Sequence, residues 1–257
     1  MCELLGMNAN VPTDIRFSFS GLMRRGGVTG PHRDGWGIAF YQGRGCRTFH
    51  DPVASADSEI AQLVRDHPIR STITIAHIRR ATHGRVCLEN THPFTRELWG
   101  RAWTFAHNGK LKGIKRRSLG VYRPIGDTDS EHAFCWLLGE VRKRFPERPA
   151  SARKLWAVIG DLAQDLTSLG IFNMLLSDSC HLYGFCGTRL SCLTRRAPFG
   201  AATLIDQDLT ADFAAETNDH DVVTVLATQP LTANENWRAL APGTLVVLRG
   251  GEVVYGG

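Results

Sequence analysis

The chain has 257 residues, of which 43% are hydrophobic and 21% are charged, so it can form the large core of a globular protein. It contains no run of about 18 or more apolar residues and no basic region ahead of an apolar run at its start. We therefore expect no membrane span, no signal peptide and a cytoplasmic location. The formal net charge of +5 is spread over short basic runs rather than one long tract, which argues against nucleic acid as a partner.

The first 80 residues predict a mixture of strands and helices. Strands are expected at 3–8, 36–41, 46–50 and 71–80, and helices at about 13–24 and 55–66. Gly43 and Gly45 predict a hairpin turn between the second and third of these strands. The helix at 55–66 is expected to bury one face, which carries Ile60, Leu63 and Val64.

The rest of the chain predicts two longer helices among many strands. One helix follows the capping-box sequence Thr128-Asp129-Ser130-Glu131, and the other ends at Gly170. Strands are expected at 103–109, 171–178, 181–187, 191–195, 222–228, 244–250 and 252–256, with a polar loop at 205–220.

Helices in two places among antiparallel-looking strands favour an α+β fold. An economical arrangement packs two β-sheets face to face and places helices outside both. No repeat and no linker divides the sequence, so we expect one domain over residues 1–257.

The cysteines predict a reducing environment. There are seven of them, an odd number with no CxxC pair, so we expect mostly buried free thiols. Cys180, Cys186 and Cys192 are evenly spaced beside His181, which raises the question of a metal. Even spacing fits one face of β structure better than a zinc site, whose ligand pairs are closer, so no metal is expected.

Cys2 has two interpretations. It is either a small apolar residue at the start of a strand or a nucleophile. Cysteine is small enough for methionine aminopeptidase to remove Met1, which would leave the thiol beside its own free α-amino group. That amine has an ordinary pKa of about 7.7–8.0, so it can act as the base near neutrality and the thiol needs no histidine.

The sequence His107-Asn108-Gly109 closes a predicted strand and also has two interpretations. Asn-Gly is a common turn dipeptide, and a plain turn is the simpler interpretation. Alternatively, the Asn108 carboxamide and the Gly109 N–H point at one oxygen and stabilise the oxyanion that forms during attack on an amide.

Charged residues at two element ends suggest recognition of an amino acid. Arg79 and Arg80 end the apolar strand at 71–80, where one guanidinium can bind a carboxylate bidentately. Two solvated arginines at a sheet edge are the alternative. Asp129, in the first turn of its helix, suits the helix dipole and can equally bind a substrate ammonium group.

These motifs occur together in an informative order. Cys2, HIRRATHG (77–84), AHNG (106–109) and GDTDSE (126–131) follow one another as in the class II glutamine amidotransferase domain. The sequence resembles this family of N-terminal-nucleophile hydrolases, and most closely its small stand-alone YafJ-like subgroup. The resemblance rests on specific motifs from residue 2 to about residue 140. After residue 140 it rests mainly on the order of the predicted strands.

The resemblance implies a fold, an activity and a set of site residues. The fold is a four-layer αββα sandwich, and the activity is release of ammonia from glutamine without a metal or organic cofactor. Cys2 would attack the glutamine amide, Asn108 and Gly109 would form the oxyanion hole, Arg79 and Asp129 would bind the α-carboxylate and α-ammonium groups, and Thr82 and His83 would line the pocket.

Two departures from the family leave alternatives open. Larger relatives often have Trp where this chain has Arg80, so the pocket rim and the substrate are expected to differ. No synthase domain is visible, so we expect any ammonia acceptor on a separate protein. Cleavage of a γ-glutamyl peptide or thiol conjugate is one alternative, and a non-catalytic binding protein is another; the oligomeric state stays open.

Overall fold

The structure is a computed structural model that describes residues 2–81, 84–214 and 217–256. Its helices are α1 (Arg16–Arg25), α2 (Glu59–Asp66), α3 (Asp129–Arg144) and α4 (Ala152–Thr167), with 3₁₀ turns η1 (Leu88–Asn90) and η2 (Ile114–Arg116). The strands are β1 (Glu3–Asp14), β2 (Trp36–Gln42), β3 (Gly45–Asp51), β4 (Arg70–Ile78), β5 (Phe94–Leu98), β6 (Arg101–Leu111), β7 (Gly170–Ser177), β8 (Leu182–Cys186), β9 (Ser191–Arg196), β10 (Ala201–Thr203), β11 (Thr210–Asp212), β12 (Val222–Ala227), β13 (Arg238–Ala239), β14 (Thr244–Arg249) and β15 (Glu252–Tyr255). In this described part, no helix is long and apolar enough to cross a membrane.

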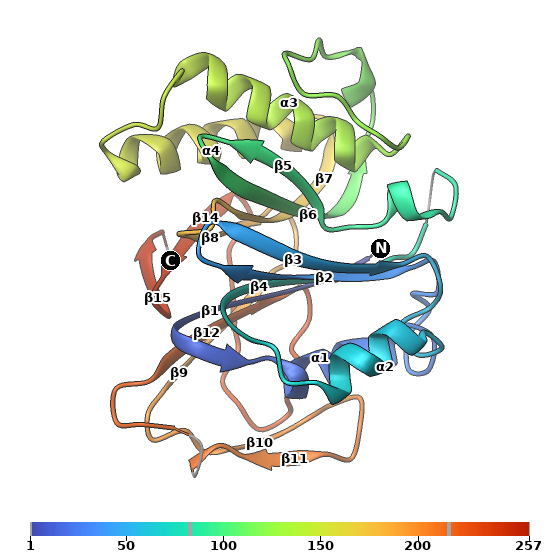
Figure 1. The fold of residues 1–257 in the computed structure, drawn as a ribbon, viewed down its shortest axis with the longest axis vertical. Coiled ribbons are helices and arrows are strands. Elements are labelled where there is room, and N and C mark those ends of the chain that lie inside the picture. Colours follow the sequence, from blue (N-terminus) through green and yellow to red (C-terminus); the bar gives the residue numbers. More distant parts are fainter. Residues whose placement is uncertain (1, 82–83, 215–216, 257) are drawn as a thin grey trace.

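The strands form two large antiparallel sheets. One has the order β13-β9-β12-β1-β4-β2-β3, and the other has the order β15-β14-β8-β7-β6-β5. Figure 1 shows the two sheets face to face in the middle of the molecule, with α1 and α2 outside the first and α3 and α4 outside the second. The α+β fold, a four-layer αββα sandwich, is therefore as expected. The short pair β10-β11 stands apart from both sheets.

Side chains of β1 alternate between two cores. Leu4 lies in the layer between the sheets with Ala106 of the opposite sheet, whereas Leu5 packs in the cluster that includes the buried face of α1. Because side chains along a strand alternate with period two, Cys2 shares the face of Leu4, and Asn108 shares the face of Ala106. Both residues therefore face the layer between the sheets.

The first strand is longer than predicted. β1 continues through Pro12 to Asp14, and α1 begins only at Arg16. The ladder between β1 and β4 shifts its register between Asn8 and Thr13 and then resumes. A bulge of this kind accommodates Pro12, which has no N–H to donate to a ladder.

The prediction for the second helix was wrong in its length and in part of its buried face. The helix begins after Ser58, whose hydroxyl accepts a hydrogen bond from the Ala61 N–H. Val64 is buried as expected, but Ile60 is 40% exposed and Leu63 is 51% exposed. The helix has only two turns, and it buries the narrow line formed by Ala61 and Val64.

The turn interpretation of Asn108 and Gly109 is wrong. β6 continues to Leu111, which pairs with Gly170 at the start of β7, so both residues lie inside a strand. Gly170 thus opens β7 rather than closing α4. The sequence also did not predict the short strands β5, β10, β11 and β13, and β11 lies in the segment predicted as a loop at 205–220.

The predicted cap of α3 is present in modified form. The Thr128 hydroxyl accepts a hydrogen bond from the Glu131 N–H, as in a capping box. The Glu131 carboxylate instead accepts hydrogen bonds from the N–H groups of Ile125 and Gly126 and pairs with Arg96. The cap therefore also fixes the loop that leads into the helix.

All seven cysteines have free thiols, but they are less buried than predicted. Only Cys135, Cys186 and Cys192 are fully buried. Cys186 and Cys192 belong to different sheets, and both lie in the layer between the two sheets. Cys180 lies in the loop before β8. The even spacing of the three cysteines therefore does not reflect one face of a strand. Within the described residues, no three His, Cys, Asp or Glu side chains are grouped as metal ligands.

Candidate active site

Cys2 lies at the start of β1, at the end of the sandwich where the N-terminus enters between the sheets (Figure 1). Its thiol lies 3.6 Å from the Arg80 carbonyl oxygen, and the Arg80 N–H donates to Sγ at 3.4 Å. Burial raises the pKa of the Cys2 thiol, while the hydrogen bond from Arg80 and the charge of Arg79 act in the opposite direction. A thiol in this setting needs a base to become a nucleophile.

Arg79 follows β4 directly and neighbours Cys2 on the adjacent strand. Its side chain is turned inward, since the residue is only 3% exposed, and its Nη1 donates to the carbonyl oxygen of Arg85 at 3.0 Å. Arg80 is exposed, so only the first of the two arginines faces the interior.

The backbone after β4 is held by the segment before β2. The Arg79 N–H donates to the carbonyl oxygen of Gly35 at 2.7 Å, and the Asp34 N–H donates to that of Arg79 at 3.1 Å. The Asp34 carboxylate accepts a hydrogen bond from the Ala81 N–H at 2.7 Å. These bonds fix the chain that faces Cys2.

The loop that follows contains two predicted site residues, Thr82 and His83, which lie outside the described residues. Gly84 comes next, with a positive φ of 78° that favours glycine. A Cβ atom there would lie 3.0 Å from Asp127 Oδ1 and 3.5 Å from Arg79 Nη2. The absence of a side chain lets the loop pass close to both charged groups.

Asn108 is fully buried on β6 and faces the layer between the sheets. Among the described residues, neither its Nδ2 nor its Oδ1 has a hydrogen-bond partner. An unpaired buried polar group costs about 1–3 kcal/mol, so this carboxamide is expensive to keep unless it serves a bound molecule.

Gly109 presents its N–H at the edge of β6 that faces away from β7. The Lys112 N–H donates to the carbonyl oxygen of Leu169, on the side of β7, whereas the Leu111 N–H donates to Asp129 at 2.7 Å. Because amides alternate between the two edges of a strand, the Gly109 N–H lies on the same edge as that of Leu111. A Cβ atom at Gly109 would lie 1.8 Å from the Ile171 carbonyl oxygen, so only glycine fits.

Asp129 connects the start of α3 to the end of β6. Its Oδ2 accepts the hydrogen bond from Leu111, and its Oδ1 accepts one from the Ser130 N–H at 3.0 Å. Its negative charge raises the pKa of the Cys2 thiol, so it lies within electrostatic range of the sulfur. A cavity of about 500 Å³ adjoins Asp129 and is also lined by Gly84 and the end of β6. The predicted residues Cys2, Arg79, Asn108, Gly109 and Asp129 thus come from different elements to one end of the sandwich.

Comparison with known proteins identifies the family. Residues 1–256 match the model of the family described as class-II glutamine amidotransferases. The chain belongs to the class II glutamine amidotransferases. It is 60% identical over 243 residues to YafJ of Escherichia coli (strain K12), which carries a provisional glutamine amidotransferase name, and the match covers 95% of each chain. A similarly named Haemophilus influenzae protein is 44% identical over 99% of this chain and 86% of its own.

Solved structures agree with this assignment. The crystal structure of a predicted glutamine amidotransferase from Pseudomonas aeruginosa PA01 has a TM-score of 0.80 at 55% identity, and the match covers 99% of this chain and 100% of that one. Glutamine phosphoribosylpyrophosphate amidotransferase from B. subtilis has a TM-score of 0.60 at 15% identity, and the match covers 96% of this chain and 47% of that one. The second likeness shows that the fold is shared.

Sequence reasoning missed a buried ionic network beneath the start of β1 in this amidotransferase. Glu3 is buried next to Cys2, where burial raises the pKa of its carboxyl group and Arg25 opposes the rise. Arg25 lies 3.2 Å from Glu3 and 2.6 Å from Asp206, and it also donates to the Pro230 carbonyl oxygen. Glu3 at the start of an apolar strand was the signal that could have revealed this network, because a buried carboxylate needs a partner.

A pair of adjacent buried histidines also went unnoticed in the amidotransferase sequence. The rings of His77 and His92 lie 4.2 Å apart and are both buried. Burial lowers the pKa of both far below the ordinary value, so both are neutral at pH 7. Their ring nitrogens have no hydrogen-bond partner in the described part of the chain. His77 shares the strand face of Arg79, so the pair extends the polar layer behind the site.

Proposed function

We propose that this amidotransferase domain hydrolyses glutamine to glutamate and ammonia through a thioester on Cys2, after removal of Met1. One observation carries the proposal: a thiol on one sheet and the unpartnered carboxamide of Asn108 on the facing sheet both project into the layer between the sheets. The pair provides a nucleophile and a donor for the negative charge that its attack creates.

The first step is attack of the Cys2 thiolate on the side-chain carbonyl carbon of glutamine. The carbonyl oxygen becomes an oxyanion, which accepts hydrogen bonds from Asn108 Nδ2 and the Gly109 N–H. Two features support these roles: no described acceptor competes for Nδ2, and Gly109 has its N–H at the open edge of β6. Preorganised donors of this kind are typically worth about 10²–10³ in turnover.

The base in this proposal is the free α-amino group of Cys2. It takes the thiol proton and gives it to the departing ammonia, and water then cleaves the thioester to release glutamate and restore the thiol. The hydrogen-bond partner of Sγ in the described residues is the Arg80 backbone rather than a histidine. Burial also lowers the pKa of His77 and His107, which makes them poor proton acceptors.

Recognition in this proposal falls to Arg79, Asp129, Thr82 and His83. Arg79 would bind the α-carboxylate and Asp129 the α-ammonium group, with Thr82 and His83 lining the pocket. The support is a buried guanidinium and a carboxylate that both influence the pKa of the Cys2 thiol and therefore lie near it. A γ-glutamyl peptide or thiol conjugate carries the same two charged groups, so it would satisfy this recognition equally well.

A substrate panel tests the proposal. Processed protein that starts at Cys2 is incubated with glutamine and with γ-glutamyl amides at matched concentrations, and glutamate release is measured. Labelling with 6-diazo-5-oxo-norleucine is followed by mass spectrometry, with a Cys2 adduct as the expected result. Release from γ-glutamyl amides but not from glutamine would favour the γ-glutamyl alternative, whereas no turnover and no adduct would favour a binding protein.

A further inference from the structure

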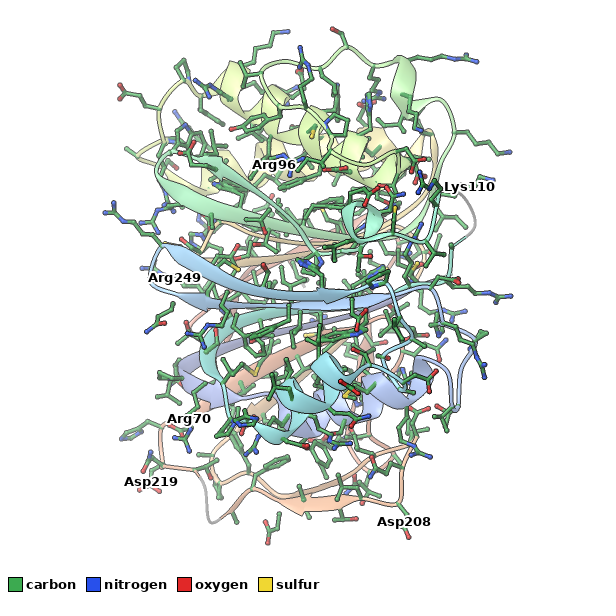
Figure 2. All side chains as sticks on the ribbon, turned by 45° about the vertical axis from the view of Figure 1, so that its right-hand side comes forward. Arg70, Arg96, Lys110, Asp208, Asp219 and Arg249 are labelled. Carbon is green, nitrogen blue, oxygen red and sulfur yellow. The ribbon has the colours of Figure 1, made fainter. Side chains whose placement is uncertain are left out.

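A second polar site lies at the end of the molecule opposite Cys2. It is a cavity of about 190 Å³ between the start of α4, the turn before β8 and the end of β14. Figure 1 shows the loop from α3 to α4 and strand β14 on the side away from the N-terminus, and Figure 2 shows Arg249 on the side opposite Lys110, which follows Gly109. We propose that this cavity binds a phosphoryl group, either as inorganic phosphate or on a small phosphate monoester.

Two arginines provide positive charge at the cavity. Arg148 and Arg249 both line it, the first from the loop before α4 and the second from the last position of β14. Arg101 lies close behind and donates to the sulfur of Cys180, another lining residue, at 3.1 Å. Guanidinium groups match the geometry of phosphate oxygens and bind them bidentately.

The N-terminus of α4 adds a second attraction for an anion. Ala150 and Ala152 line the cavity, and the helix between residues 152 and 167 is long enough to carry a substantial dipole. Ser151, the N-cap residue, makes no side-chain cap hydrogen bond in the described structure, and the first turn contains no acidic residue. Its first N–H groups are therefore available to an anion.

A buried histidine supplies the third observation, which is independent of the helix. His181 lines the cavity, is only 3% exposed, and has no described hydrogen-bond partner at Nε2. Its Nδ1 lies 3.2 Å from both carboxylate oxygens of Asp178, so the ring orientation is fixed and Nε2 is turned away from Asp178. The Nε2 atom is enclosed by protein, and the His181 ring packs edge to face against Trp156 with 5.4 Å between the ring centroids.

The carboxylate of Asp178 is ion-paired with Arg148, which compensates its negative charge, and its oxygens accept hydrogen bonds from the protein. Its Oδ1 accepts hydrogen bonds from the N–H groups of Cys180 and His181, and its Oδ2 accepts one from Arg148 at 3.1 Å. Asp178 therefore holds the arginine and the histidine in place for a ligand. A cavity of this size fits a phosphoryl group with a small organic group attached to it rather than a nucleotide.

The test measures binding of inorganic phosphate and of glycerol 3-phosphate to the full chain by calorimetry at constant ionic strength. The matched variants are Arg249→Gln, which removes a lining charge, and Arg153→Gln, which removes an exposed charge from the first turn of α4 that does not line the cavity. We expect Arg249→Gln to weaken phosphate binding by about tenfold, as loss of a charged hydrogen bond should, and Arg153→Gln to change it less than about twofold.

Each outcome decides for or against the site. Tighter binding of the ester than of phosphate would identify a metabolite as the ligand, and equal binding would identify the free anion; both support the proposal. Equal losses of phosphate affinity in Arg249→Gln and Arg153→Gln would mean that phosphate is held only by the general positive charge of the protein, and would overturn the proposal. So would acetate binding as tightly as phosphate, or no saturable binding by either probe. Arg249→Lys, which keeps the charge, should retain part of the affinity and guards against misfolding as an explanation.

Discussion

The two ends of the sandwich differ in how their buried polar side chains are partnered. At the Cys2 end, beside the ionic network of Glu3, the side chains of Asn108, His77 and His92 are neutral, and their polar atoms lack partners within the described residues. At the other end, Asp178 is charged and bound by His181 and by the backbone. Burial alone would raise the pKa of the Asp178 carboxyl, but its partners lower it overall.

The difference indicates what each end receives. Neutral donors without partners suit a negative charge that exists only during a reaction, because a fixed positive charge would bind the ground state as well as the transition state. A network in which Asp178 is already compensated, beside a cavity lined by Arg249, suits a ligand that brings its own negative charge. The predictions below test whether the unpartnered groups at the Cys2 end are functional, beginning with the largest expected effect.

Blocking the N-terminus should have the largest effect. An uncleavable extension before Cys2 converts its α-amino group into an amide nitrogen that cannot accept the thiol proton. We expect glutamine hydrolysis to be abolished, with the thermal unfolding midpoint unchanged. Mass spectrometry of active protein should show a chain that starts at Cys2, and Cys2→Ser should retain little activity because a hydroxyl is a weaker nucleophile.

The contrary result is easy to recognise. Full activity in protein that retains Met1 would rule out the α-amino group as the base, even though membership of the family would be unaffected. A normal unfolding midpoint with no activity is required, because an extension that unfolds the protein would say nothing about the proton acceptor.

Arg79→Ala should have the next largest effect. Removing one partner of a buried charged contact costs about 2–5 kcal/mol, so kcat/KM for glutamine should fall by roughly a thousandfold. The loss should appear mainly in KM, because the α-carboxylate is bound equally in the ground and transition states. Arg153→Ala, a control at an exposed arginine in the first turn of α4, should change kcat/KM by less than about threefold. Unchanged kcat/KM in Arg79→Ala would remove this residue from substrate recognition.

Much of this arrangement could be predicted from the sequence, and the failures have physical causes. The order of Cys2, HIRRATHG, AHNG and GDTDSE gave the family and the fold, because chemistry restricts which residues can occupy those positions. Asn108-Gly109 was ambiguous because the dipeptide suits a turn locally, and only the pairing of Thr104 to Leu111 with β7 decides for a strand. Long-range pairing of that kind leaves no local signal.

Buried polar contacts were the other class of failure. Glu3 in an apolar strand gave a hint, but its partner Arg25 and the Asp206 that also pairs with Arg25 lie on other segments, which only the fold brings together. The exposure of Ile60 and Leu63 was missed for a related reason. The periodicity of a two-turn helix does not reveal which side faces the sheet. The Ser58 cap fixes the residue at which the helix begins, and with it which side chains face inward.

Two neighbouring asparagines provide the next prediction. Asn108 and Asn173 are paired across β6 and β7 and are both fully buried, but Asn173 donates to the Asn108 carbonyl oxygen and accepts from three backbone N–H groups. Asn108→Ala should lower kcat by about a hundredfold or more and change the free energy of unfolding by less than about 1 kcal/mol. Asn173→Ala should lower the free energy of unfolding by about 3 kcal/mol or more. Equal stability losses in both variants would make Asn108 a structural residue.

The smallest expected effect concerns pH. Burial depresses the folded-state pKa of His77 and His92 below the unfolded value of about 6.5, so below that pH the unfolded state binds more protons. Stability is therefore fully present above about pH 6.5 and is lost as pH falls towards the folded pKa values. Two such histidines add at most about 2.7 kcal/mol per pH unit to the slope of unfolding free energy against pH.

Replacing one of the two histidines should isolate its share of this slope. His92→Phe removes one titrating group and keeps a ring against Phe94, whose ring centroid already lies 4.4 Å from that of His92. Because no described group bonds to the His92 nitrogens, the apolar ring should cost little at pH 7. Denaturant unfolding from pH 7 to 5 should show a slope smaller by up to about 1.4 kcal/mol per unit. An unaltered slope in His92→Phe would mean that His92 is protonated or paired in the folded protein, and the contrast between the unpartnered groups at the Cys2 end and the paired groups at the other end would then fail.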